Sequence, residues 1–549
     1  MQNVSLKQSA QKSPQLDKGV FWPAIVIIVS LALPLVLFPD PVRAGVGELL
    51  AFITGQLGWL LLLFGFACLL FLAWLAFSRY GDIKLGGADE PPEFSKRSWV
   101  AMLFCAGIGI AIVNWAFVEP IYLMNEPAMG IAGGSVQAIE WATMYSQFHW
   151  GIIPWAIYSI ATVPVAYSLY VRRRPYLRFS SAAKPLLGHH SDGAIGKLID
   201  LIVILSILGG VGTSLGLSIP LVTGLLGTLF ELENTAGLNI VVLVIWTGIF
   251  SYSAYMGLGK GIKVLSDINI SMAFGLLAFV LLVGPTIFIF KLWSNSLGLY
   301  LDNFIHIALW TDPVTDSGFT EKWTVFYWAW WIAYAPMMAL FIARISRGRT
   351  IREVILNEVL WGSAGCMAFF AIWGGYSVYL ETQALVNVSE ILMREGTAGA
   401  VIAVMQSLPG GWLLLAVFTL LCFIFLATTL DSAAYTLASV STRNLSGYQE
   451  PARWNRLLWA FLIAIVGVAL LMVGGLDIVQ VSTLLFSLPM MVVLIVLCWA
   501  LYKQLKQDFP ELSQRPVIVM QEKRLPMEAA EVDCEPEDVM PPVSQGLTT

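Results

Sequence analysis

The sequence predicts an all-α polytopic membrane protein, and three observations carry this prediction. Hydrophobic residues make up 58% of the 549 residues and charged residues only 12%, with a mean hydropathy of +0.76; these values lie far outside the range of a soluble domain. Apolar stretches of about 20 residues, the length that crosses a bilayer, recur along nearly the whole chain. Basic residues gather in every second loop between them. The lipid bilayer is therefore the first expected partner.

Twelve transmembrane helices are predicted. They lie near residues 20–39, 57–78, 98–121, 140–171, 195–229, 239–258, 264–290, 323–343, 353–380, 411–442, 456–474 and 478–502. One membrane domain therefore fills residues 20–505, between a cytoplasmic N-terminal tail (1–19) and a cytoplasmic C-terminal tail (506–549). The acidic stretch "EAAEVDCEPEDV" in the second tail is typical of a disordered segment.

Basic residues predict the orientation, because they stay on the cytoplasmic side of a membrane. Alternate loops are basic, as in "RRRPYLR" from Arg172 to Arg178 and "RISRGR" from Arg344 to Arg349. We expect both termini on the cytoplasmic side of a bacterial-type inner membrane. The first 19 residues lack the layout of a secretory signal, so the first span is expected to be retained.

Composition also excludes several classes of site. The six Cys have no paired spacing, so we expect neither a disulfide nor a metal site. The net charge of −5 is small, and no basic run with interleaved aromatic residues predicts a nucleic-acid partner. The sequence contains no P-loop, no metal-spaced cluster and no nucleophile elbow, which predicts a protein that is not an enzyme.

Two spans depart from a regular helical pattern. "CAGIGIAIVNW" places Gly107 and Gly109 at the middle of the third span, and "ATTLDSAAYT" lies in the tenth. Irregular backbone at this depth is tolerated where it faces protein or a water-filled cavity, and in transporters such breaks mark substrate and ion sites. Close packing of neighbouring helices on the glycines is the alternative interpretation.

Aromatic rings crowd the eighth span, in "WAWWIAYAPM" from Trp328 to Met337. At about 100° per residue, one quarter of the helix circumference collects five rings and a thioether: Trp323, Tyr327, Trp330, Trp331, Tyr334 and Met338. An interfacial belt would lie at the ends of the span, whereas Trp330, Trp331 and Tyr334 lie nearer its middle. Core packing and a ligand-binding box both remain open at this point.

A ligand-binding box of this kind would favour a quaternary ammonium group. Aromatic faces carry negative quadrupoles and attract cations, and quaternary ammonium groups are the cations most often recognised in this way. No acidic residue lies on this face of the span. A zwitterion with a trimethylammonium head therefore suits the face better than an inorganic cation. A channel, the main rival class, would need an open pore or a ring of like residues.

Ionisable residues inside the spans are further functional candidates. Two interpretations of Glu119 are open, a role in the loop and a role in substrate binding. Asp431 follows the Thr428–Thr429 pair closely enough to tune cation binding. For His149 the two alternatives are a structural hydrogen bond and a role in a proton relay.

The chain resembles the betaine/choline/carnitine transporter family over most of its length. The resemblance rests on "EPPEFSKRSW" before the third span, "FHWG" at Phe148 to Gly151, "GTSLGL" at Gly212 to Leu217, "GKGIKVLSD" at Gly259 to Asp267, and "FYWAWW...FIARISRGRT" from Phe326 to Thr350. Members are secondary transporters of trimethylammonium compounds. The resemblance implies two leading helices, two inverted five-helix repeats of the leucine-transporter type, and a homotrimer.

The resemblance also assigns substrate residues. Trp330, Trp331 and Tyr334 match the aromatic box on the eighth helix, and Tyr122 matches the box tyrosine of the third. A second aromatic pair, nearer the access path, is matched by Trp115 and Trp323. Tyrosine at position 334 is typical of the carnitine/γ-butyrobetaine antiporter branch. The alternative is a sodium-coupled glycine betaine or choline symporter.

Coupling residues follow from the same resemblance. Sodium-coupled relatives use backbone carbonyls matching Cys105 and Ile108 and hydroxyls matching Thr428 and Thr429. Sodium-independent exchangers place an Arg at the position of Asn269. Symporters of the family have a second sodium position formed by hydroxyls that match Ile207 and Val211, and neither residue can donate an oxygen here. Met338 occupies the position of the methionine that exchangers place near that site.

The resemblance therefore predicts no cofactor other than one coupling sodium ion. Hydrogen bonds from the two threonines to the preceding helical turn are the alternative interpretation of that pair.

Overall fold

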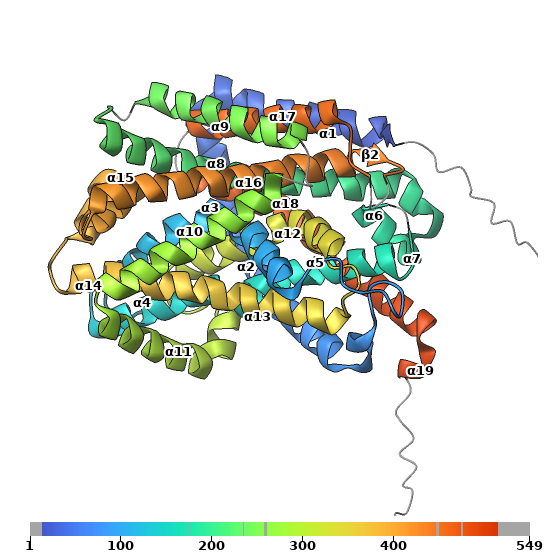
Figure 1. Ribbon diagram of the computed structural model, residues 1–549, viewed down its shortest axis with the longest axis horizontal. Helices are drawn as coiled ribbons and strands as arrows, with labels where there is room; N and C mark the ends of the chain where they lie inside the picture. Colours follow the sequence, from blue (N-terminus) through green and yellow to red (C-terminus); the bar gives the residue numbers. More distant parts are fainter. Residues whose placement is uncertain are drawn as a thin grey trace, which may run out of the picture.

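The computed structural model describes residues 14–174, 176–233, 235–256, 261–445, 449–473 and 476–513. Within these ranges the chain is almost wholly helical (Figure 1). The first half contains β1 (Gln15–Leu16), α1 (Lys18–Leu37), α2 (Pro39–Phe77), η1 (Arg79–Asp82), α3 (Lys96–Asn125), α4 (Val136–His149), α5 (Ile152–Tyr170), α6 (Phe179–Ala182), α7 (Lys184–Leu187), η2 (Gly188–Asp192), α8 (Ala194–Phe230), α9 (Ala236–Met256) and α10 (Gly261–Val283).

The second half continues in the same way. It contains α11 (Thr286–Leu309), η3 (Thr320–Val325), α12 (Phe326–Ile345), α13 (Ile351–Phe369), η4 (Phe370–Gly374), α14 (Gly375–Thr382), α15 (Val388–Gln406), α16 (Gly411–Val440), β2 (Thr442–Arg443), α17 (Arg453–Val473), α18 (Leu476–Asp508) and α19 (Pro510–Ser513).

The predicted fold class, an all-α polytopic membrane protein, is confirmed. Among the described residues nine helices are long and apolar enough to cross a membrane, and two bent pairs raise the number to eleven. The apolar part of α1 is shorter than these spans. The count of twelve and the inverted repeat stay predictions.

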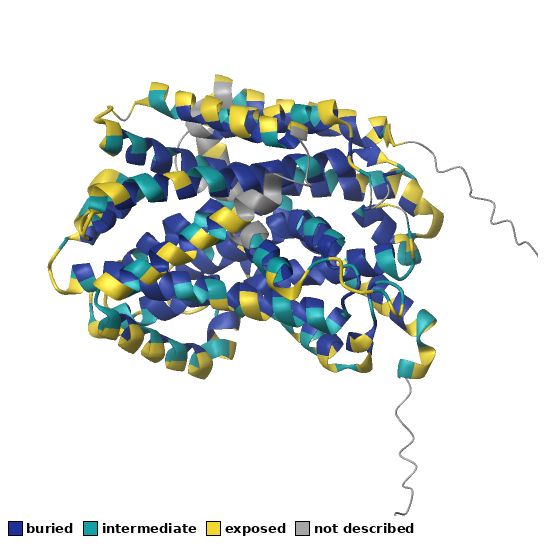
Figure 2. Cartoon of the chain, in the orientation of Figure 1, coloured by how far each residue is buried: buried dark blue, intermediate teal, exposed yellow. Residues whose placement is uncertain are grey.

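Helix α12 lies in the interior of the bundle, where α5, α8 and α18 pack around it (Figure 1). Of its most apolar window, 94% is buried inside the protein. By contrast, α1, α9 and α17 lie side by side along one edge and expose apolar side chains there (Figure 2). A helix that is apolar on all sides has no polar face to present to water, so it packs inside the protein or faces lipid. Helix α12 is the former case.

The third span breaks where the glycines predicted it. Gly109 has φ +50° and ψ −164° inside α3, and the segments Lys96–Phe104 and Gly109–Asn125 meet at 64°. A positive φ favours glycine because a side chain would clash with the backbone there. A second bend of 111° separates Asp267–Val283 from Thr286–Leu309. Helix α11 therefore turns sharply away from the span before it.

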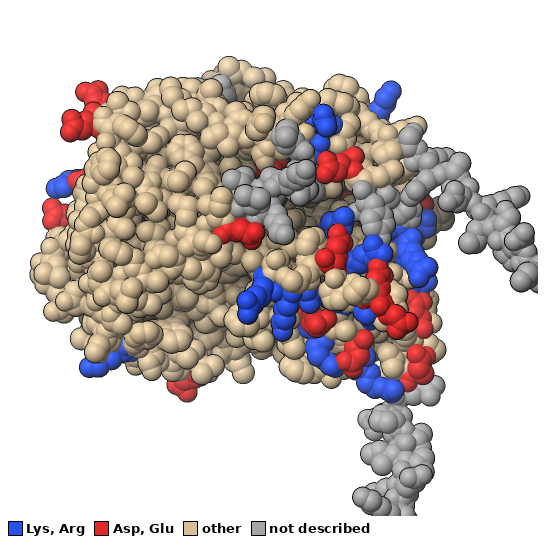
Figure 3. Space-filling model, viewed as in Figure 1, with Lys and Arg blue, Asp and Glu red and all other residues tan. Residues whose placement is uncertain are grey.

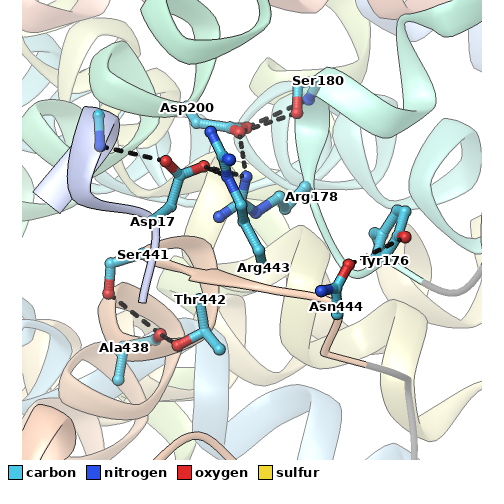
Figure 4. A network of polar contacts seen from close by, with 11 residues as sticks. Asp17, Tyr176, Arg178, Ser180, Asp200, Ala438, Ser441, Thr442, Arg443 and Asn444 are labelled. Carbon is cyan, nitrogen blue, oxygen red and sulfur yellow. Dashed lines mark hydrogen bonds and ion pairs between the residues drawn. The ribbon is translucent and has the colours of Figure 1, made fainter. Parts of the chain in front are cut away.

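Charged side chains concentrate at one end of the molecule, the right-hand end in Figure 3, where α6, α7 and α19 lie. A polar network at this end holds the N-terminal segment (Figure 4). The Asp17 carboxylate forms ion pairs with Arg178 at 3.0 Å and Arg443 at 2.7 Å, and Asp200 approaches Arg178 at 3.3 Å. Strand β1 pairs with β2 antiparallel beside it.

The charge of Asp17 is stabilised within this network. Burial raises the pKa of its carboxyl, but the hydrogen bonds and charges of Arg443 and Arg178 outweigh burial and hold the pKa below its usual value. The first residues of the predicted N-terminal tail that the structure describes are thus fixed to the segments that follow α5 and α16.

The contact between α5 and α13 supplies a test of the packing. A Cβ atom on Gly362 would lie 2.1 Å from the Trp155 ring. We predict that Gly362→Ala lowers the free energy of unfolding by about 1–3 kcal/mol through overpacking. Gly248→Ala is the matched control, because nothing lies within 4 Å of that Cβ position, and it should stabilise helix α9 slightly. Thermal unfolding in detergent measures both; equal midpoints would contradict the contact.

Candidate functional site

A cavity lies where α3, α5, α8, α12 and α16 meet. About 380 Å³ of space lies between its walls, including space that is open to solvent. Its wall consists of small backbone positions on α3, aromatic rings and hydroxyl groups: Gly107, Gly109, Ala111, Trp150, Tyr158, Ser214, Trp330, Trp331, Tyr334 and Thr429. None of these described lining residues carries a formal charge at neutral pH. The site can therefore hold a cation by ring faces but not by a carboxylate.

Each indole on α12 is held by a specific contact. Trp331 lies between Tyr158 and Trp150, with ring centroids 4.6 Å and 5.5 Å away. Trp330 donates from Nε1 to the Gly210 carbonyl oxygen at 3.3 Å. These contacts fix the direction in which each ring faces, so the cavity wall is formed before any ligand arrives.

Tyr334 is fixed by helix α8. Its hydroxyl lies 2.5 Å from the Ser214 hydroxyl, and its ring packs so closely on α8 that a Cβ on Gly210 would come within 2.8 Å of it. Trp330 and Tyr334 meet edge to face, with centroids 6.4 Å apart. Two hydroxyl groups and two ring systems therefore share one wall.

The structure divides the predicted aromatic residues into two groups. Trp330, Trp331 and Tyr334 line the cavity. Trp115, Tyr122 and Trp323 instead form a second cluster, with centroid distances of 5.7 Å, 5.9 Å and 6.4 Å among them. Tyr122 is not among the cavity-lining residues, although the family resemblance placed it in the box.

Tyr327 joins the two groups of rings. Its centroid lies 6.4 Å from Trp323 and 6.3 Å from Trp330, and both pairs are stacked. Trp323 belongs to the π-helical segment η3, which widens the helix locally. Trp323 contacts Trp115 and Tyr122 in addition to Tyr327.

Three cavity residues escaped sequence analysis: Trp150, Tyr158 and Ser214. Trp150 lies at the break between α4 and α5, inside the "FHWG" motif that carried the resemblance. Ser214 lies inside the "GTSLGL" motif, which also carried the resemblance, whereas Tyr158 lies on a long apolar helix with no local signal. Their place in the site depends on tertiary packing alone.

A buried hydrogen-bond network holds the Trp150 indole in place. The Glu119 carboxylate accepts hydrogen bonds from Trp150 Nε1 at 2.9 Å and from the Tyr327 hydroxyl at 2.6 Å. Its other oxygen lies 2.8 Å from His149 Nδ1, and His149 Nε2 lies 3.1 Å from the Thr324 hydroxyl. Glu119 and His149 are fully buried. Of the alternatives for His149, a structural hydrogen bond is the arrangement observed.

The candidate ion position lies beside the break in α3. Thr428 and Thr429 both donate their hydroxyl protons to the Phe425 carbonyl oxygen, at 2.8 Å and 3.1 Å, which leaves their oxygen lone pairs free. A Cβ on Gly109 would lie 2.9 Å from the Thr429 hydroxyl. The side chains of Cys105 and Ile108 lie outside the described residues. These bonds to the preceding helical turn are the alternative interpretation of the pair, and they are present. The free lone pairs suit an oxygen-coordinated cation, and the sodium site stays a prediction.

The remaining coupling positions are buried near the same helices. Asn269 is fully buried, and neither atom of its amide has a partner among the described residues. The Met338 methyl group packs against α3, 3.1 Å from the Cβ position of Gly107. Ile207 and Val211 are buried on α8. Asn269 therefore retains hydrogen-bonding capacity, whereas Met338, Ile207 and Val211 present no oxygen.

Comparison with known proteins agrees with this arrangement. A sequence model described as "BCCT, betaine/carnitine/choline family transporter" matches residues 19–510. An uncharacterized transporter of Escherichia coli K12, YeaV, is 38% identical over 445 residues, which cover 81% of this chain and 92% of the relative. A carnitine transporter of Acinetobacter baumannii is 36% identical over 449 residues, covering 82% of this chain and 81% of the relative.

The Glu119 network supplies a test. We predict that Glu119→Ala lowers the free energy of unfolding by about 3–5 kcal/mol, because it leaves buried donors without an acceptor. Glu119→Gln retains one acceptor oxygen towards Trp150 and Tyr327, and His149 can change tautomer, so its cost should stay near 1 kcal/mol. Thermal unfolding in detergent compares the two variants. Equal losses of stability in the two variants would show that hydrogen bonding to this carboxylate does not stabilise the fold.

Proposed function

The chain belongs to the betaine/carnitine/choline family of transporters, and from this premise we propose that it carries carnitine, γ-butyrobetaine or a similar betaine by alternating access. The observation that carries the proposal is the aromatic cavity without formal charge. Its rings from α12, α5 and the α4–α5 break converge on one space of about 380 Å³.

The chemistry of the cavity favours a trimethylammonium group. Such a cation cannot donate hydrogen bonds, so it needs no acceptor oxygen, and ring faces stabilise it by about 1–2 kcal/mol each when water is excluded. Trp330, Trp331 and Trp150 are arranged to present several rings together. The hydroxyls of Ser214, Tyr334 and Tyr158 are the polar groups on the same wall. They supply donors for the carboxylate of a zwitterion.

Carnitine-type compounds are preferred over other betaines on two grounds. Tyr334 matches the carnitine/γ-butyrobetaine antiporter branch, and the A. baumannii relative is named a carnitine transporter. The runner-up is a sodium-coupled glycine betaine or choline symporter, which the Thr428–Thr429 pair supports. Competition by unlabelled betaines against labelled carnitine in proteoliposomes, with and without a sodium gradient, separates these candidates.

The proposed setting is the inner membrane, with both termini on the cytoplasmic side. The charged end of the molecule in Figure 3 supports this orientation, because it carries the basic loops that follow α5 and α12. A homotrimer is proposed from the family resemblance. Two inverted repeats rocking around the cavity would expose it alternately to each side.

Trp331 tests the substrate box. We predict that Trp331→Leu, which keeps apolar bulk but removes the ring quadrupole, weakens carnitine binding by about 5- to 30-fold, the equivalent of 1–2 kcal/mol. Trp328→Leu is the matched control: Trp328 is buried on the same helix but does not line the cavity. Equilibrium binding to purified protein measures both variants. Unchanged carnitine affinity in Trp331→Leu would reject the box.

Thr429 tests the proposed single sodium ion. We predict that sodium accelerates carnitine uptake by the wild type, and that Thr429→Ala removes this acceleration because one oxygen ligand is lost. Thr436→Ala is the control, a hydroxyl on the same helix that bonds to the Ser432 carbonyl oxygen. Initial rates of carnitine uptake into proteoliposomes, compared between a sodium buffer and a potassium buffer without choline, measure the effect. The same sodium dependence in wild type and Thr429→Ala would remove the ion from this position.

A further inference from the structure

Helix α13 carries a buried carboxylic acid that the proposed transport site does not use. The side chain of Glu358 has no solvent exposure. It lies seven residues after Ile351, the first residue of α13, which is about 10 Å along the helix axis. Glu358 is therefore inside the bundle and not at the surface of the charged end.

The surroundings of Glu358 provide little for an ionised carboxylate. Thr162 on α5 donates to Oε1 at 3.2 Å, while Oε2 has no hydrogen-bond partner among the described residues. The Ser159 hydroxyl faces the same carboxyl. No ion pair to Glu358 occurs in the described part of the chain, since Arg352, the nearest arginine on α13, binds Asp82 and the Ala76 carbonyl oxygen.

Neighbouring helices add no countercharge. Helices α2, α3 and α5 and the short segments η1 and η4 pack against α13. The charged residues of η1 bind elsewhere, Arg79 to the Glu511 carbonyl oxygen and Asp82 to Arg352. Among their described residues, the titratable group that faces Glu358 is the Tyr158 phenol. An isolated ionised carboxylate in such surroundings loses its hydration without compensation, whereas the protonated acid loses far less and gains an O–H donor. The protonated acid is the form that these surroundings fit.

Glu358 is connected to the cavity through one helical turn of α5. The single hydroxyl proton of Thr162 is shared between Glu358 Oε1 at 3.2 Å and the Tyr158 carbonyl oxygen at 3.1 Å. The Tyr158 ring lines the cavity and packs on Trp331. In the other direction, α5 ends at Tyr170, whose hydroxyl binds the Arg344 carbonyl oxygen at the charged end. Glu358 thus lies between the cavity and the charged end.

We propose that Glu358 is a proton-binding site that couples substrate movement to a proton gradient. In the closed conformation the carboxylate carries one proton as the neutral acid. When the path between the cavity and the charged end opens, water reaches the carboxyl, the proton leaves to that side and the ionised form is hydrated. When the cavity next opens to the opposite side, the carboxylate takes up a proton from that side together with the substrate. The inference rests on the proposed function, because it supplies a coupling ion to that same transporter, at a site separate from Thr428 and Thr429.

The experiment uses the full chain in proteoliposomes with the membrane potential clamped to zero. If one proton enters with each substrate molecule, a difference of one pH unit, acid outside, sustains about tenfold accumulation of carnitine.

Glu358→Gln keeps the shape of the side chain and can still accept a hydrogen bond from Thr162, but it cannot release a proton. It should exchange internal for external carnitine at equal pH and lose pH-driven accumulation. Glu140→Gln, a half-buried acid on α4, is the matched control and should accumulate like the wild type.

The outcomes are distinct. Exchange without pH-driven accumulation in Glu358→Gln, beside accumulation in wild type and Glu140→Gln, supports the proposal. Wild-type exchange without pH-driven accumulation, or undiminished accumulation in Glu358→Gln, overturns it.

A second readout needs no substrate. If the wild type exchanges neither carnitine nor another betaine, the proposed function fails, and infrared spectra of the purified protein still decide the proton site. A protonated-carboxyl band that is present in the wild type and missing in Glu358→Gln supports the site. A spectrum of the variant that matches the wild type overturns it.

Discussion

The proposed substrate carries a positive headgroup, which has to be held at bilayer depth without a carboxylate, and the rest of the site depends on this constraint. An ionised acid in the cavity would itself have to be desolvated at a cost of several kcal/mol. Ring quadrupoles avoid that cost, because the rings are apolar when the site is empty and attractive when a cation enters. Five of the described lining residues are aromatic, and they come from α12, α5 and the break before α5.

Rings used in this way must be held in fixed directions, and polar contacts outside the cavity do so. The Glu119 carboxylate holds Trp150 and Tyr327 at once, and the Gly210 carbonyl holds Trp330. Such a network is stabilising when every member is satisfied and costly when one is removed. The break at Gly109 plays a different part, since it brings backbone of α3 to the cavity wall beside Thr429. The substrate site and the candidate ion position therefore share one wall.

Much of the fold class and part of the site could be predicted from the sequence. Apolar spans and the alternation of basic loops come directly from composition, and Gly107 with Gly109 indicated the break in α3. Helical periodicity placed Trp330, Trp331 and Tyr334 on one face, and all three line the cavity. These features could be predicted because each depends on residues that are close together in the chain.

The remainder depends on contacts between distant segments. Trp150, Tyr158 and Ser214 join the site only through the packing of α5 and α8 on α12. Glu119 and His149 were noticed separately, but no spacing rule pairs residues on α3 and α4. Trp323 stacks on Tyr327, its neighbour on the predicted helix face, and also contacts Trp115, the pairing that the family resemblance implied. Tyr122 follows Trp323 into the outer cluster.

The central claim is that ring faces bind the substrate through its positive charge and not through its shape. The most direct measurement is displacement of labelled carnitine from the purified protein by an analogue in which carbon replaces the ammonium nitrogen. This analogue has the same bulk around its quaternary centre and no positive charge. The aromatic cavity predicts that it fails to displace carnitine at concentrations where unlabelled carnitine displaces it fully. Equal displacement by the two compounds would contradict the account.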